Sequence, residues 1–207
     1  MYITKLIIIF ALTLLSINCS PFLSIKNNKI YEGIGFNHIE IDKTTKSDVL
    51  RKFGYKYREY GGGSYDEISY EQKGIGFRGK WWSEHSNLQE ITLALNKING
   101  TTSKGLKANR NTKIKDVFKI YGEPKDRYGD EVYIGRYDDG TFDEVSFYLD
   151  YPQLGISFYV TPKLHHIKDA ENMTDQELIA ISLDIDSFYL NQPINAIILY
   201  KVEKVEE

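Results

Sequence analysis

The sequence predicts an α+β fold of two tandem repeats, each a short helix followed by about four antiparallel strands, with both helices packed on one face of the sheet. The first observation is a repeated stretch: residues 48–54, DVLRKFG, correspond to residues 116–122, DVFKIYG, at an offset of 68. The second is a threonine shortly before each copy, Thr44 and Thr112. The third is an aromatic-rich run after each copy in which apolar and polar residues alternate, which is typical of strands with one buried face.

Length and composition fit two small halves that share one core. The chain has 207 residues, 42% of them apolar, which is enough to build such a core. Its 26 basic and 29 acidic residues are interspersed and leave a formal net charge of −3. Because no block of Lys and Arg gathers to bind phosphates, we expect no nucleic-acid partner.

The N-terminus predicts export. Lys5 precedes an apolar run over residues 6–15, which is shorter than the roughly 20 residues of a membrane span and has the length of a signal-peptide core. The following stretch, Leu-Ser-Ile-Asn-Cys-Ser, resembles a bacterial lipobox, although Ser16 and Asn18 stand where the common pattern has Leu and Gly or Ala. We therefore predict a signal peptide over 1–18 and a lipidated tether over 19–30. The alternative is an ordinary signal peptide or an uncleaved anchor with an incidental cysteine.

Cys19 is the only cysteine, so the rest of the chain has no intramolecular disulfide, cysteine-based metal site or catalytic thiol. A lipid on Cys19 would hold the protein at a membrane surface while its folded part stays in water. The sequence thus predicts a cell-envelope, outer-membrane lipoprotein.

The first repeat is predicted over 31–100. Its helix opens with a capping pair, Thr45 and Asp48, and Gly54 is placed to end it in a left-handed conformation. We expect strands over 55–60 and in the alternating runs that follow, with a turn at the three glycines 61–63. One apolar face and one wet face indicate an antiparallel sheet covered on one side.

The second repeat is predicted over 101–207, after a loop at 99–105. Its helix starts at Thr112, spans roughly 113–121 and ends at Gly122-Glu123-Pro124. Asp138-Asp139-Gly140 indicates a hairpin turn between strands. An insertion over about 162–192 contains Thr174 and Glu177, spaced as at a helix start.

These repeats resemble the β-lactamase-inhibitor-protein and SmpA/OmlA (BamE-like) lipoprotein fold over roughly residues 40–200. The residues that carry the resemblance are Thr112, Asp116-Val117 and Tyr121-Gly122-Glu123-Pro124, and more weakly Thr44, Asp48-Val49 and Phe53-Gly54. The first half departs from the family at Tyr55-Lys56, where the family has a residue followed by proline. The resemblance implies a non-enzymatic envelope protein that binds another protein on its sheet.

Common catalytic and metal motifs are absent from the sequence. It contains no phosphate loop, no Gly-x-Ser-x-Gly elbow and no His-Glu-x-x-His helix, and His165-His166 are adjacent rather than four apart. We therefore predict no catalytic residues, no metal and no cofactor. An enzyme acting on envelope polymers stays open as an alternative, because paired carboxylates meet in space rather than in sequence.

The sequence as a whole predicts a non-enzymatic protein-binding module, of the inhibitor or interaction type, anchored to the membrane by its N-terminal lipid. A structural scaffold of outer-membrane assembly is the alternative. Because Trp, Tyr and Arg dominate binding hot spots, the predicted partner-binding residues are Tyr57, Tyr60, Tyr70, Arg78, Trp81, Trp82, Tyr148 and Tyr159.

Overall fold

The computed structural model describes residues 28–62, 65–80, 86–124, 133–136, 142–162, 173–174, 176–177 and 187–202. Two sheets and a few short helices make up this part of the chain, so the predicted α+β class is confirmed. The helices are α2 (Lys46–Phe53), α3 (Ile114–Tyr121), the four-residue α5 (Ser187–Leu190) and the 3-10 turn η1 (Pro152–Leu154).

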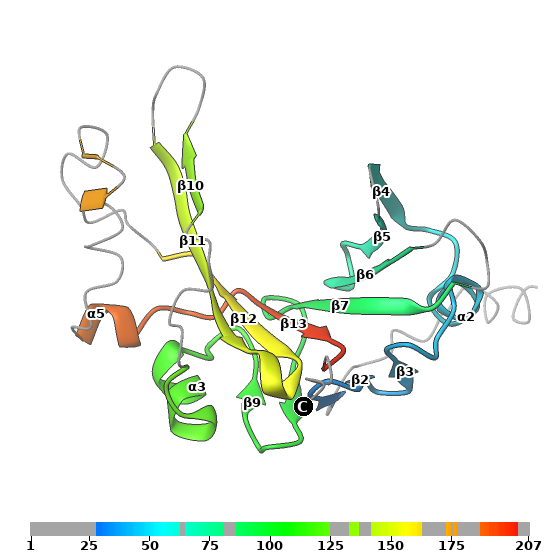
Figure 1. The fold of residues 1–207 in the computed structure, drawn as a ribbon, viewed down its shortest axis with the longest axis horizontal. Helices are drawn as coiled ribbons and strands as arrows, with labels where there is room; N and C mark the ends of the chain where they lie inside the picture. Colours follow the sequence, from blue (N-terminus) through cyan, green and yellow to red (C-terminus); the bar gives the residue numbers. More distant parts are fainter. Residues whose placement is uncertain are drawn as a thin grey trace, which may run out of the picture.

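The larger sheet has eight antiparallel strands in the order β10-β11-β12-β13-β7-β6-β5-β4. Its strands are β4 (Arg58–Gly62), β5 (Tyr65–Tyr70), β6 (Ile75–Gly79), β7 (Leu88–Ala94), β10 (Tyr133–Arg136), β11 (Phe142–Tyr151), β12 (Ile156–Val160) and β13 (Ala196–Tyr200). In Figure 1, β10 and β11 rise on one side and β4 to β6 on the other, with β7 and β13 between them. The sheet is therefore strongly curved.

The smaller sheet has the order β3-β2-β1-β8-β9, with β1 and β8 parallel. Its strands are β1 (Asn28–Tyr31), β2 (Gly35–Phe36), β3 (Ile39–Glu40), β8 (Gly100–Thr102) and β9 (Lys107–Ala108). The prediction of a loop over 99–105 was wrong for residues 100–102, which form β8. Strands of two to four residues are too short to carry a readable two-residue period, so only their partners reveal them.

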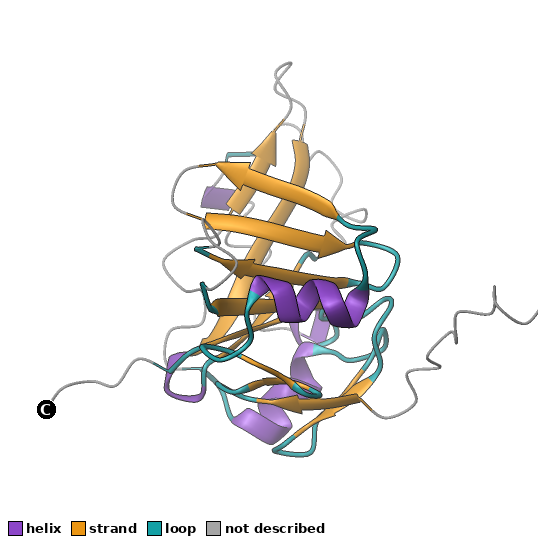
Figure 2. Cartoon of the chain, turned by 90° about the vertical axis from the view of Figure 1, so that its right-hand side faces the viewer, coloured by secondary structure: helices purple, strands orange, loops and turns teal. Residues whose placement is uncertain are grey.

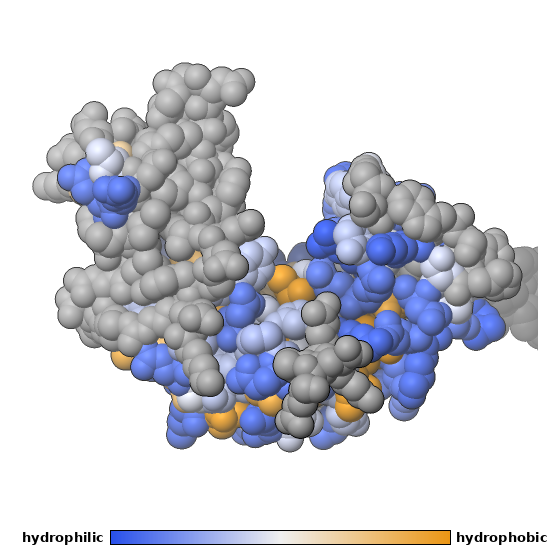
Figure 3. All heavy atoms as spheres, viewed as in Figure 1, coloured by the Kyte–Doolittle hydropathy of each residue, from blue (hydrophilic) through white to orange (hydrophobic). Residues whose placement is uncertain are grey.

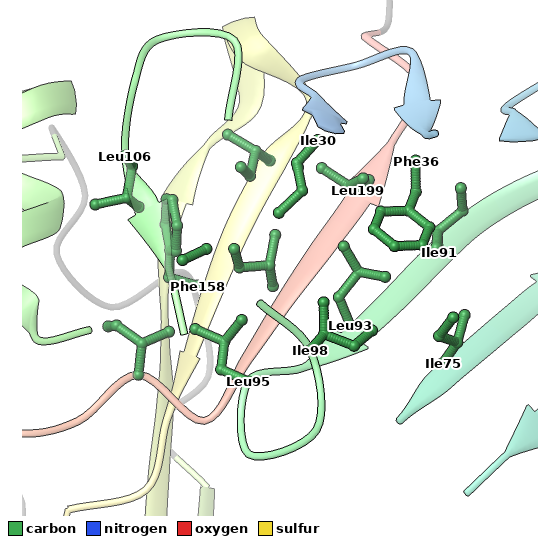
Figure 4. Packing of buried hydrophobic residues seen from close by; sticks show 14 of the residues in the cluster. Ile30, Phe36, Ile75, Ile91, Leu93, Leu95, Ile98, Leu106, Phe158 and Leu199 are labelled. Carbon is green, nitrogen blue, oxygen red and sulfur yellow. The ribbon is translucent and has the colours of Figure 1, made fainter. Parts of the chain in front are cut away.

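One core lies between the two sheets. Figure 4 shows Ile30, Phe36 and Leu106 of the small-sheet region opposite Leu93 and Leu199 of the large sheet. All five side chains are buried. Figure 2 shows a helix crossing in front of the large sheet's strands, with the smaller group of strands below.

Helix α2 begins and ends at the predicted residues. The Asp48 backbone N–H donates to the Thr45 hydroxyl at 3.2 Å, and the Thr45 N–H donates to the Asp48 carboxylate at 3.1 Å. These bonds satisfy amides that the first turn leaves unpaired. Gly54 ends the helix with φ 91° and ψ −178°, so its φ is positive as expected but its ψ is extended rather than left-handed helical.

Helix α3 is capped one residue later than predicted. Its N-cap is Lys113, whose N–H donates to the Asp116 carboxylate at 3.0 Å. The Thr112 hydroxyl instead accepts from the Asn109 N–H at 2.8 Å and donates to the Lys107 carbonyl at 3.0 Å. Thr112 therefore holds the preceding loop against β9, a role that spacing alone did not indicate.

The same two contacts attach each helix to the sheet strands that follow it. The Tyr70 hydroxyl donates to the Gly54 carbonyl, and the Tyr151 hydroxyl donates to the Gly122 carbonyl, both at 2.6 Å. The Leu88 N–H donates to the Thr44 carbonyl and the Ile194 N–H to the Thr112 carbonyl, both at 2.8 Å. A helix of only two turns is marginal by itself, so these attachments at its two ends help to hold it.

Three further predictions concern the glycine turn at 61–63, the helix start at Thr174 and the hairpin turn at 138–140. Gly61 and Gly62 pair with Asp66 and Tyr65 as part of β4, so the predicted turn at 61–63 was wrong for these two. The Thr174 hydroxyl and N–H donate to the Glu177 carboxylate at 2.8 Å, as its spacing predicted. The predicted turn at 138–140 and residues 163–172 lie outside the described residues.

We expect Tyr70→Phe and Tyr151→Phe each to lower the free energy of unfolding by about 1 kcal/mol, because each variant leaves a helix-terminal carbonyl without its partly buried donor. Urea unfolding of the two variants would measure the loss. Tyr60→Phe is the matched control, since its hydroxyl bonds to Glu71 in an exposed setting. Losses no larger than that of the control would contradict the role of the two tyrosines.

Candidate functional site

The face of the large sheet opposite the core carries a continuous polar row, which we call the charged row. Directly paired residues on neighbouring strands share one face. The register pairs Tyr60 with Glu67, Glu67 with Arg78, Arg78 with Glu90, and Glu90 with Tyr200. The charged row therefore crosses five strands from β4 to β13, and it joins residues up to 140 positions apart in the sequence.

Beside the charged row lies a row of mostly small residues, the floor row. From β6 to β11 its members are Gly76, Thr92, Ile198, Ser157 and Asp150. A Cβ on Gly76 would stand 3.0 Å from a Glu67 carboxylate oxygen, so the absence of a side chain lets Glu67 lie across the strand.

The outer face is concave. Figure 1 shows β10 and β11 rising on one side of β7 and β13, and β4 to β6 rising on the other. In the space-filling view of Figure 3, hydrophilic residues predominate on the right-hand part of the described surface. A groove of about 820 Å³ lies at this face, and its lining includes Tyr65, Arg78, Glu90, Pro152 and Tyr200. The groove thus includes Arg78, Glu90 and Tyr200 of the charged row, and it extends beyond the row to Asp42 and Lys201.

Charged and aromatic groups hold Arg78 over the groove. Its guanidinium lies 4.7 Å from the centre of the Tyr65 ring, and a guanidinium nitrogen lies 3.7 Å from the Glu90 carboxylate. Burial raises the pKa of Glu90, and the nearby Glu67 carboxylate raises it further, while Arg78 acts in the opposite direction. The ionised form of Glu90 is therefore less stable at this position than it would be in water.

A second polar group lies where the two rows approach each other on β11 to β13. The Ser157 hydroxyl donates to the Asp150 carboxylate and lies 3.3 Å from the Tyr200 hydroxyl. Burial raises the pKa of Tyr200. These contacts orient Tyr200 at the end of the charged row.

The predicted partner-binding residues divide between the two faces. Tyr60 and Arg78 belong to the charged row, and Tyr148 and Tyr159 form a cross-strand pair on the outer face with ring centres 5.2 Å apart. Tyr60 is 48% exposed.

Tyr70 is a core residue, only 3% exposed, so its prediction as part of a binding surface was wrong in placement. Tyr70 pairs with Ile75 on the neighbouring strand and lies two residues after Ile68 in β5. The alternation of β5 therefore places Tyr70 on the same buried side as Ile68. Tyr57 is half-buried and packs 6.1 Å from the Tyr70 ring. The other predicted residues, Trp81, Trp82 and Cys19, lie outside the described residues.

Sequence reasoning missed Tyr65, Glu67, Glu90 and Tyr200. By strand alternation, Glu67 lies on the side opposite Ile68, and Glu90 lies on the side opposite Ile91. Alternation could not show that Glu90 and Tyr200 are neighbours, because that depends on the pairing of β7 with β13.

The described residues contain no group of three or more His, Cys, Asp or Glu side chains arranged to hold a metal ion. None of the helices in this part of the chain has the length and apolar character needed to cross a membrane. Hydrogen bonding, ion pairing and ring stacking are the interactions that the outer face offers to another molecule.

Comparison of the chain with protein-family models, curated proteins and solved structures found no match. The likeness to the β-lactamase-inhibitor-protein and SmpA/OmlA fold therefore stays a prediction.

We expect Glu90→Gln to change how stability depends on pH. A carboxyl whose pKa is raised by folding contributes stability that is fully present below its usual pKa of 4.5 and is lost as pH rises through the higher folded-state value. The melting temperature of Glu90→Gln relative to the wild type should therefore increase as pH rises from 4.5 toward neutrality. Thermal unfolding of both proteins over this range measures the difference, and a difference independent of pH would contradict the prediction.

Proposed function

We propose that this protein is a lipid-anchored protein of the bacterial cell envelope that binds a protein partner on the outer face of its large sheet and catalyses no reaction. The observation that carries the proposal is the contrast between the two faces of that sheet. The small sheet and the aromatic residues of α2 and α3 pack on one face. Among the described elements, none covers the charged row and the floor row on the other.

The composition of the outer face supports a protein partner. Tyrosine supplies a large rigid contact area with a polar tip, and it is enriched in binding hot spots. Five tyrosines belong to this face or its groove: Tyr60, Tyr65, Tyr148, Tyr159 and Tyr200. Because these tyrosines lie on strands toward both ends of the large sheet and in its middle, a partner could contact them across the full width of the concave face.

We also propose that the two halves are tandem repeats of one helix and four strands. The matching attachments of α2 and α3 to the sheet support this, as does the symmetric strand order on either side of the β13–β7 pair. Fusion of two such units through β7 and β13 would produce a concave face twice as wide as one repeat could offer. A wide, curved face suits a folded protein better than a small ligand.

Site-specific photo-crosslinking in the native host tests the proposed surface. A photoreactive phenylalanine analogue at Tyr60 or at Tyr159 should give a discrete crosslinked protein, because both positions lie on the outer face. The same analogue at Lys52, an exposed position of α2, is the control and should not give that product. One soluble product would indicate an inhibitor, whereas abundant envelope proteins would indicate a scaffold.

Crosslinking from Lys52 but from neither outer-face position would contradict the proposed surface. Thermal unfolding of each labelled protein must stay close to that of the wild type, so that a lost product reports lost contact rather than lost folding.

The proposed anchor predicts a specific mass. Mature protein from the native membrane fraction should begin at Cys19 and carry a diacyl or triacyl addition detectable by mass spectrometry. Cys19→Ala should lack this mass and lose the lipid-anchored form. An unmodified cysteine in the mature wild-type protein would remove the anchor from the proposal and leave a secreted binder.

A further inference from the structure

Basic residues are interspersed but unevenly distributed along the chain. Between residues 97 and 119 there are seven Lys or Arg residues and one acidic residue, Asp116. The remaining chain has 19 basic and 28 acidic residues. This segment forms β8, β9 and most of α3, so a protein of net charge −3 contains a strongly positive region.

The small sheet displays part of this charge on the side away from the core. Lys29 of β1 pairs with Thr101, and Thr101 pairs with Lys107 of β9, so the three residues form one cross-strand row. Lys29 and Lys107 are exposed, whereas the next residues, Ile30 and Ala108, are buried. The two lysines therefore point outward from the same face of the small sheet.

Two further cations belong to the same region, which we call the basic face. Lys104 lies in the turn between β8 and β9, Arg110 follows β9, and both are exposed. Within the part of the chain that the structure describes, none of the ion pairs involves Lys29, Lys104, Lys107 or Arg110. The Lys104 ammonium lies 5.8 Å from the centre of the Tyr121 ring, and its backbone N–H donates to the Glu32 carboxylate at 3.3 Å. Lys29, Lys107 and Arg110 are therefore the cations of this face that can meet an external anion.

The basic face also has a cavity and exposed apolar side chains. A depression of about 380 Å³ is lined by Lys107, Arg110 and polar neighbours that include Asn109. Tyr31 is 39% exposed and Ile34 is 55% exposed, and both lie in the β1–β2 hairpin of the same sheet. Cations beside exposed tyrosine and aliphatic side chains are the combination that binds the headgroup region of a bilayer.

We propose that the basic face docks on an anionic phospholipid bilayer. The inference rests on the proposed function only for the anchor. Asn28, the first residue of β1, is nine positions after Cys19, so the chain from one to the other spans at most roughly 30 Å. A lipid on Cys19 would therefore keep the small sheet close to the membrane. A lipid anchor and a basic patch together bind a membrane more firmly than either alone.

Docking in this way also orients the protein. The small sheet and the charged row lie on opposite sides of the large sheet, because the small sheet packs on its buried face. Contact between the basic face and the bilayer would turn the outer face away from the membrane. The proposed partner would then meet it from the aqueous side.

Vesicle flotation tests the basic face without the lipid. The probe is the mature chain from residue 19 with Cys19→Ser, mixed with phosphatidylcholine vesicles that contain or lack phosphatidylglycerol. Binding should require phosphatidylglycerol and should weaken in about 1 M salt, where the Debye length falls to about 3 Å. The double variant Lys107→Gln and Arg110→Gln should bind roughly 30-fold more weakly, since each cation near an anionic surface contributes a factor of about 5.

The charge-matched control is Lys56→Gln with Lys80→Gln, which removes two exposed cations beside β4 and β6. It should bind phosphatidylglycerol vesicles as the parent chain does. Absence of binding to these vesicles, equal binding to phosphatidylcholine alone, or equal losses in the two double variants would each overturn the docking proposal. A chain that binds as expected here, but has an unmodified Cys19 in its native form, would keep the docking surface and refute only the anchor.

Discussion

The pairing of β7 with β13 is the constraint on which the rest of the structure depends. Five residue pairs, from Ala94–Ala196 to Glu90–Tyr200, join the last strand of the first half to the last strand of the second. Without them, each half would be a four-stranded sheet with an unpaired edge, and such edges are liable to pair with other chains. The pairing produces one sheet, and therefore one buried face and one outer face.

The apolar side chains on the buried face have to be covered by other apolar groups. Ile91 and Leu93 of β7 and Ile197 and Leu199 of β13 lie at the centre of the sheet with their side chains fully removed from water. The small sheet supplies the apolar residues above them, including Ile30 and Phe36. The two main helices cover the sheet on either side of these central strands. The ring centre of Phe53 in α2 lies 5.0 Å from that of Phe77, and the ring centre of Tyr121 in α3 lies 5.2 Å from that of Phe158. All of this described cover lies on one side. On the other side Tyr60 and Arg78 are exposed, whereas Ser157 of the floor row is buried among its neighbours.

The distribution of charge follows the same division. On the outer face, acids and bases alternate, and Arg78 lies between Glu67 and Glu90. On the far side of the small sheet, Lys29 and Lys107 lie in one cross-strand row, and basic residues outnumber the acid Glu32 that contacts Lys104. A surface that carries both positive and negative groups favours a partner with a specific, complementary arrangement of charges. A mainly positive surface favours a partner whose negative charge is spread over a wide area. The proposals of a protein on one side and a bilayer on the other follow from this difference.

By itself, the sequence determined the local features of this protein. The caps of α2, the glycines after both helices and the alternation of the long strands follow from hydrogen-bonding capacity and side-chain period, which act within a few residues. Tyr60, Arg78, Tyr148 and Tyr159 could be placed on an outer face by that alternation. Alternation also places Tyr70 on the same side as Ile68. The small sheet and the charged row could not be predicted, because each depends on which distant segments pair. Only the tertiary structure decided that Glu90 and Tyr200 are neighbours, since register between strands is set by the packing of a shared core rather than by either strand alone.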